Sequence, residues 1–241
     1  MKLPKAIVAL LLLLSAYNAS AHALWLQTSG TGKKGTPHEV IVYFAEPAQQ
    51  KELLDSKEWS MAKGFDLWAV SPSGKQFKLE AKPQKDCYAA TFTPEEEGLY
   101  RVLLKHERIG VLTFDGTGSF VPYFYACTNV WIGNDHAVAN VISPDRSLLP
   151  MSILPVLSKG TQKVFFHATL PEGLKYQITV FSPSGKHINI AANGSNQLVF
   201  DAVEQGGYQV EVSAVDTKPG TIGGREYQKA FHIATTTFEI K

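Results

Sequence analysis

The sequence predicts an all-β protein built from two tandem Ig-like β-sandwich domains, with one short helix inserted in the first. Three observations lead to this fold class. The chain contains an internal repeat, its apolar residues alternate in short runs bounded by turn residues, and a Tyr follows a Gly at the start of one run in each copy of the repeat.

The repeat is clearest at a five-residue turn. The run Phe65–Val70 leads into Ser-Pro-Ser-Gly-Lys at 71–75, and the run Tyr176–Phe181 leads into the same five residues at 182–186. Proline fixes φ and glycine permits a positive φ, so each copy predicts a hairpin into a second alternating run.

The two copies remain parallel after the hairpin. Each continues with an alternating run, an acidic turn and then a Gly followed closely by Tyr100 or Tyr208, which resembles the tyrosine corner of Ig-like sandwiches. We therefore expect one domain over residues 22–132 and a second over 156–241. The segment 133–155, which holds three prolines, is the expected inter-domain crossing.

One stretch departs from the β pattern. Residues 49–63 are rich in Lys, Glu, Gln and Leu, and Leu53, Leu54 and Trp59 are spaced for one helical face. This predicts the inserted helix, with the apolar stripe used for packing.

The N-terminal residues 1–21 have the three parts of a secretory signal peptide. Lys2 and Lys5 supply positive charge, Ala6–Ala16 is apolar, and Ala19-Ser20-Ala21 has the small-x-small pattern of a cleavage site. The apolar part is far shorter than the ~20 residues of a membrane-spanning helix. We therefore expect a periplasmic or secreted protein with no direct membrane insertion.

The position of cleavage decides which residue becomes the new N-terminus. A cut after Ala21 would leave His22 first, and this is the expected site. Ala21-His22-Ala23 has the same small-x-small pattern, so a cut after Ala23, leaving Leu24 first, stays open.

Charge and cysteine content limit the possible partners. Loss of the two leader lysines would turn a formal net charge of +1 into −1, which leaves no electrostatic footprint for nucleic acid. The sequence contains two cysteines, Cys87 and Cys127, and in the expected oxidising compartment such a pair commonly forms a disulfide. Their spacing alone does not decide between a disulfide and two free thiols.

Common enzyme motifs are absent from the sequence. There is no G-x-S-x-G, H-E-x-x-H, P-loop or C-x-x-C pattern, and the glycine-rich stretch 220–224 is not followed by a helical pattern. We therefore expect a non-enzymatic protein.

His22 is the most distinctive candidate ligand, because a terminal His offers a free amine and an imidazole that can close a chelate on Cu or Ni. If strand A is Leu24–Thr28, strand B Glu39–Phe44 and strand F Leu99–Lys105, Ig-like topology places one end of the first domain near that terminus. The residues expected there as metal ligands are His22, Glu46, His106 and Glu107.

Three segments resemble the NikM-like family of exported proteins, a domain family of unknown function linked by name to nickel uptake. They are Ala21–Leu26 (AHALWL) at the export junction, Val42–Glu46 (VYFAE), and a closing stretch with Gly224–Tyr227 and Thr235–Phe238. The resemblance implies an Ig-like envelope protein that handles a transition metal beside a transporter or outer-membrane receptor.

Together these features favour an exported, periplasmic binding module for Cu or Ni, or a metal-uptake accessory protein whose partner is a membrane transporter or outer-membrane receptor. The alternative is a structural or adhesive Ig-like module that binds another protein without metal. A third interpretation, a terminal-His copper centre that activates oxygen, lacks any sign of a substrate-binding face.

Overall fold

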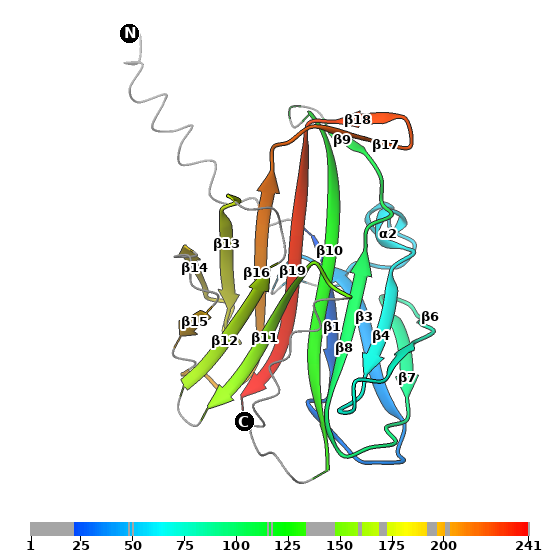
Figure 1. Ribbon diagram of the computed structural model, residues 1–241, viewed down its shortest axis with the longest axis vertical. Helices are drawn as coiled ribbons and strands as arrows, with labels where there is room; N and C mark the ends of the chain where they lie inside the picture. The colour runs from blue at the N-terminus through cyan, green and yellow to red at the C-terminus, as the bar shows by residue number, and fades with distance from the viewer. Residues whose placement is uncertain are drawn as a thin grey trace.

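The computed structural model describes residues 22–47, 49, 51–114, 116, 118–133, 148–158, 161–168, 173–191, 197–200 and 203–240. The regular structure in this part of the chain is almost entirely β-strand (Figure 1), which confirms the predicted all-β, Ig-like class. The predicted leader lies outside the described residues. No helix among them is long and apolar enough to cross a membrane.

The first half of the chain forms one β-sandwich. Its four-stranded sheet has the order β1-β3-β7-β6 and packs against the β10-β8-β4-β5 half of a ten-stranded sheet. The strands are β1 (Ala23–Thr28), β2 (Thr31–Gly32), β3 (His38–Ala45), β4 (Asp66–Val70), β5 (Gln76–Lys78), β6 (Lys82–Pro83), β7 (Tyr88–Phe92), β8 (Gly98–His106), β9 (Leu112–Phe114) and β10 (Gly118–Ile132).

The second half repeats this plan. A three-stranded sheet, β11-β12-β15, accompanies the β14-β13-β16-β19 half of the ten-stranded sheet, and a small β17–β18 hairpin stands apart from both. The strands are β11 (Met151–Ser158), β12 (Thr161–Ala168), β13 (Tyr176–Phe181), β14 (His187–Ala191), β15 (Gln197–Phe200), β16 (Gly206–Asp216), β17 (Gly220–Ile222), β18 (Arg225–Tyr227) and β19 (Lys229–Ile240).

The ten-stranded sheet is shared by both sandwiches. Strands β10 and β19 run parallel and pair from Phe120 with Lys229 to Cys127 with Thr236, so one continuous sheet crosses the molecule. In Figure 1 strands β11 and β12 cross in front of this shared sheet, whereas β1 and β3 lie behind it. The segment expected to be an inter-domain crossing is partly regular structure, because β11 already begins at Met151.

Two hydrophobic cores lie on opposite faces of the shared sheet, because successive side chains of a strand point to opposite sides. On β10, Phe124 and Ala126 join the first core, and Tyr125 and Cys127 join the second. Cys87 belongs to the first core, so the sheet separates the two cysteines, and both are free thiols. A disulfide between them is therefore not formed.

The sequence repeat is also a repeat of side-chain contacts. The Tyr100 hydroxyl accepts hydrogen bonds from the backbone N–H groups of Glu95 (3.1 Å) and Glu96 (3.0 Å). At the equivalent place, the Tyr208 hydroxyl accepts from the N–H of Glu204 and donates to its carbonyl, both at 3.1 Å. The predicted tyrosine corners are thus present in both sandwiches.

The inserted helix is shorter than the sequence predicts. It covers only Lys57–Ala62 (α2), because Ser56 caps it by accepting a hydrogen bond from the N–H of Trp59. Among the preceding residues, those at 51–53 lie outside regular structure and 54–55 form a turn. The apolar stripe packs as expected at Trp59, which is fully buried, but Leu53 is 47% exposed.

Candidate functional site

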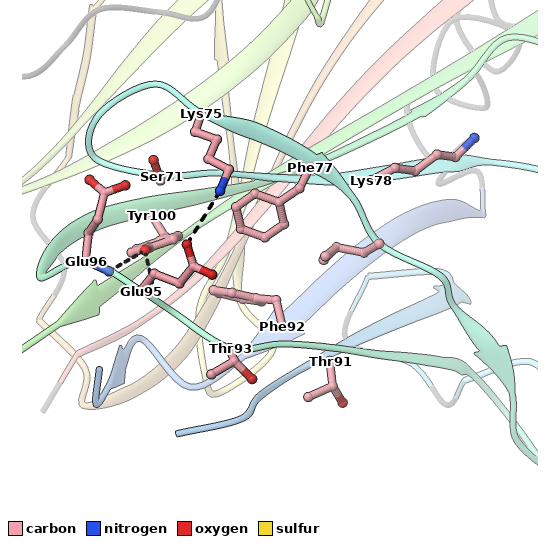
Figure 2. A pocket seen from close by; sticks show the side chains of 11 residues that line it. Ser71, Lys75, Phe77, Lys78, Thr91, Phe92, Thr93, Glu95, Glu96 and Tyr100 are labelled. Atoms are coloured by element: carbon pink, nitrogen blue, oxygen red, sulfur yellow. Dashed lines mark hydrogen bonds and ion pairs between the residues drawn. The ribbon is translucent and has the colours of Figure 1, made fainter. Parts of the chain in front are cut away.

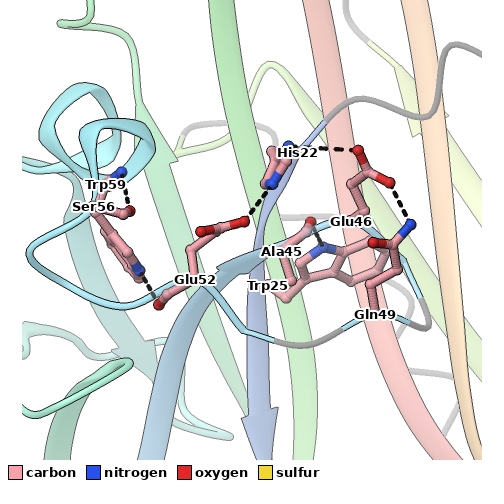
Figure 3. A network of polar contacts seen from close by, with 8 residues as sticks. All are labelled: His22, Trp25, Ala45, Glu46, Gln49, Glu52, Ser56 and Trp59. Carbon is pink, nitrogen blue, oxygen red and sulfur yellow. Dashed lines mark hydrogen bonds and ion pairs between the residues drawn. The ribbon is translucent and has the colours of Figure 1, made fainter.

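The imidazole of His22 lies between two carboxylates at the start of β1 (Figure 3). Its Nε2 is 2.8 Å from Oε1 of Glu52, and its Nδ1 is 3.7 Å from Oε1 of Glu46. All three side chains are about one-third exposed, at 30% for His22, 27% for Glu46 and 31% for Glu52. The group is therefore open to solvent while its ring has a defined position.

The strand pairing of β1 with β3 brings His22 and Glu46 together. Ala23 pairs with Ala45, so the residue before one strand and the residue after the other meet at the same end. The second carboxylate oxygen of Glu46 accepts a hydrogen bond from the amide of Gln49 at 2.5 Å. Beneath the site, the ring of Phe44 lies 5.3 Å from the His22 ring at an interplanar angle of 34°.

Glu52 is held by its backbone as well as by its side chain. Its N–H donates to the carbonyl of Phe44 at 2.9 Å, and its carbonyl accepts from the indole Nε1 of Trp59 at 2.8 Å. Trp59 is fully buried and sits on α2. The helix and the end of β3 together therefore fix Glu52 beside His22 (Figure 3).

His106 does not join this cluster, contrary to the sequence-based expectation. On β8 it follows Tyr100, Val102 and Leu104 on the core face, so only 2% of it is exposed. Its Nε2 is 3.3 Å from the carbonyl of Met61 on α2, and burial lowers its pKa. The His106 ring is therefore buried between β8 and α2, away from the His22 cluster.

Glu107 lies on the other side of the shared sheet from His106. It accepts a hydrogen bond from the hydroxyl of Tyr125 at 2.9 Å and pairs with Lys105 at 3.1 Å. Tyr125 belongs to the second core, and its burial, together with the Glu107 charge, raises its pKa. Glu107 and His106 therefore cannot serve one metal ion together.

The described residues contain no group of three or more His, Cys, Asp and Glu side chains placed to hold a metal ion. The reason at His22 is that Glu46 and Glu52 approach different ring nitrogens and do not converge on one point. Any metal there needs a further donor, and among the described residues a backbone amine freed at His22 is the candidate for it.

Glu52 is the residue that sequence reasoning missed. It lies in the stretch predicted to be helical, where its side chain would have pointed to solvent. Ser56, followed by a Lys-Glu pair and Trp59, was the available signal that the helix starts later.

A separate cleft of about 340 Å³ lies at the opposite end of the first sandwich from His22. Figure 2 shows Phe77, Phe92 and Tyr100 lining it, with Lys75 reaching Glu95 across its rim at 3.5 Å. Phe92 and Tyr100 belong to the first core, so this cleft lies at the edge of that core.

No family model matches the chain, and no curated protein matches it. A protein of the DUF4785 family from Legionella pneumophila is similar in structure, at 12% identity and a TM-score of 0.33, over 88% of this chain and 56% of that protein. A two-domain fibronectin type-III segment of chicken tenascin is 13% identical, with a TM-score of 0.24, over 91% of this chain and all of the segment. Salmonella alpha-2-macroglobulin is 9% identical, with a TM-score of 0.31, over 90% of this chain and 15% of its own length.

Proposed function

We propose that the protein is an exported, non-enzymatic binding module that takes up Cu(II) or Ni(II) at His22. The observation that carries this proposal is the placement of the partly exposed His22 ring, just before β1, between two carboxylates. Carboxylate oxygen and imidazole nitrogen are ligands that suit these ions in tetragonal sites.

The ligand set consists of three donors close in the fold. Cleavage after Ala21 frees the His22 amine, which closes a chelate with Nδ1 of the same residue. Glu46 supplies an oxygen, because its Oε1 is 3.7 Å from that nitrogen, less than the sum of two ordinary metal–ligand bonds of about 2 Å. His106 and Glu107 have no part in this set.

Two sequence features support the proposal. The leader predicts export, and its expected cleavage site is adjacent to His22. The resemblance of the Ala21–Leu26 junction to NikM-like proteins points to transition-metal handling. A membrane transporter or outer-membrane receptor is the proposed partner that delivers or receives the ion.

The test compares two forms of the protein that differ only at the N-terminus. One begins with His22, and the other carries one extra glycine before it, which removes the amine from the chelate but keeps the imidazole. Titration with Cu(II) and Ni(II) by calorimetry, with electron paramagnetic resonance of the copper form, measures affinity and ligand type. His22→Ala is the second variant, and the exposed His187→Ala is the matched control.

We expect tight 1:1 binding to the His22 form, with nitrogen and oxygen ligands in the copper spectrum. The extra glycine and His22→Ala should both weaken binding by at least tenfold, whereas His187→Ala should not change it. Equal affinity with and without the extra glycine would refute the amine chelate. Absence of binding to the His22 form would refute the proposed function.

A further inference from the structure

We propose that Glu52 is a positioning residue that selects the tautomer of His22. Its carboxylate accepts a hydrogen bond from Nε2–H, which keeps the proton on Nε2 and leaves Nδ1 as the unprotonated nitrogen that faces Glu46. That Nδ1 binds a metal ion rests on the function proposed above. The preference for the tautomer protonated at Nε2 does not depend on that function.

The two carboxylates are not equivalent neighbours of the ring. A neutral imidazole carries its proton on one nitrogen only, and a hydrogen-bond acceptor at one nitrogen fixes the proton there. Oε1 of Glu52 lies 2.8 Å from Nε2, within hydrogen-bond distance, whereas Oε1 of Glu46 lies 3.7 Å from Nδ1, too far for a hydrogen bond. The shorter contact therefore favours the tautomer protonated at Nε2.

The position of Glu52 is set before any ligand arrives. Its N–H and its carbonyl are both engaged, by Phe44 and by the indole of Trp59, at 2.9 and 2.8 Å. These backbone contacts fix the Cα of Glu52 next to His22, so that the carboxylate needs no movement of the main chain to accept from the ring. Glu52 thus acts as a pre-organised acceptor.

The ring itself has little freedom to turn away. Phe44 packs against one face of His22 with ring centroids 5.3 Å apart, and Trp59 packs against Phe44 at 5.8 Å. Trp59 therefore contacts both partners: its indole N–H donates to the carbonyl of Glu52, and its ring packs on Phe44, which in turn packs on His22. A second nitrogen–carboxylate contact of this kind orients metal-bound histidines and raises their basicity.

The direct test reads the tautomer without any metal. The ring nitrogens of 15N-labelled apo protein give distinct chemical shifts when protonated and unprotonated, and they are compared at a mildly alkaline pH. The variants are Glu52→Ala, which removes the acceptor, and Glu52→Gln, whose amide oxygen can still accept the Nε2 proton. Glu39→Ala, an exposed carboxylate on β3, is the matched control. Thermal unfolding of each variant shows that it folds.

We expect His22 of the unaltered protein to be protonated at Nε2. Glu52→Ala should give a mixture of tautomers, Glu52→Gln should largely restore the original spectrum, and Glu39→Ala should match it. An Nδ1-protonated ring in the unaltered protein, or an unchanged ring in Glu52→Ala, would overturn the inference.

Copper titration of the same variants separates this inference from the proposed function. Loss of the Glu52 contact should weaken Cu(II) binding by about 10–100-fold, with partial rescue by Glu52→Gln. If the unaltered protein shows the Nε2 tautomer but binds no copper, the proposed function fails and the role of Glu52 stands. If it binds copper and Glu52→Ala changes neither affinity nor tautomer, the function stands and the role of Glu52 fails.

Discussion

Glu211 should make the folded protein less stable as the pH rises. It lies on β16, on the same side of the strand as Gln209, whose amide donates to the Tyr43 hydroxyl at 3.0 Å. Its register neighbours are Thr179 and Thr235, which carry no charge, and no ion pair in the described part of the chain includes it. Burial without a cation raises the pKa of Glu211 from 4.5 to about 7.

The sign and size of the effect follow from proton linkage. Between about pH 4.5 and about pH 7, the folded protein keeps a proton on Glu211 that the unfolded chain has released. The free energy of unfolding therefore falls as the pH rises through this window. At about 1.4 kcal/mol for each pKa unit, the loss amounts to about 3 kcal/mol above pH 7. Glu211→Gln removes the ionisation but keeps the size of the side chain.

The measurement is urea unfolding of the unaltered protein and Glu211→Gln at several pH values from about 4.5 to about 8. The difference in unfolding free energy should be small at the acidic end and should favour the variant by about 3 kcal/mol at the alkaline end. Glu39→Gln, at an exposed carboxylate, should show no such trend. A difference for Glu211→Gln that does not vary with pH would refute the reasoning.

Three further substitutions test other parts of the first sandwich. Arg108 and Lys78 lower the pKa of Asp66 to about 2, so Asp66→Asn should cost about 1–2 kcal/mol at neutral pH and much less near pH 2, where the folded carboxyl is half protonated, measured by acid unfolding; a cost that does not change with pH would contradict this. Tyr100→Phe leaves two backbone N–H groups without their acceptor and should cost about 1–3 kcal/mol in urea unfolding; an unchanged midpoint would contradict this. Gly98→Ala should destabilise more than Gly74→Ala, since both have positive φ but only the first would place a Cβ 2.9 Å from Pro72; equal melting temperatures would contradict it.

Local patterns were sufficient to predict the fold class and the repeat. The identical 71–75 and 182–186 turns and the two Gly–Tyr strand starts each depend on a few neighbouring residues, so their structure can be read from the chain directly. The parallel pairing of β10 with β19 joins residues about a hundred positions apart, and no local sequence pattern predicts it. The helix was overestimated because Lys, Glu and Leu favour a helix anywhere, whereas Ser56 fixes where it begins.

The candidate site was predicted in part. Ig-like topology was enough to bring His22 and Glu46 to one end of the first sandwich. The error at His106 came from ending the predicted strand at Lys105, because β8 continues to His106 and places it on the core face. Glu107, just beyond the strand, instead contacts Tyr125 of the second core. Glu52 could not be found, because its place depends on the indole of Trp59 and the carbonyl of Phe44, which only the folded chain brings together.

The parallel ladder between β10 and β19 also makes completion of the first half of the molecule depend on its last strand. Without β19, the edge of β10 from Phe120 to Cys127 lacks the strand that pairs with it in the folded protein, and the first core lacks Ile233. An open edge of this kind pairs readily with other chains. It stays open until β19, Lys229–Ile240, is complete, because β19 fills the gap between β10 and β16. A chain truncated before that strand would therefore keep an open β10 edge and an incomplete first core, both of which favour aggregation.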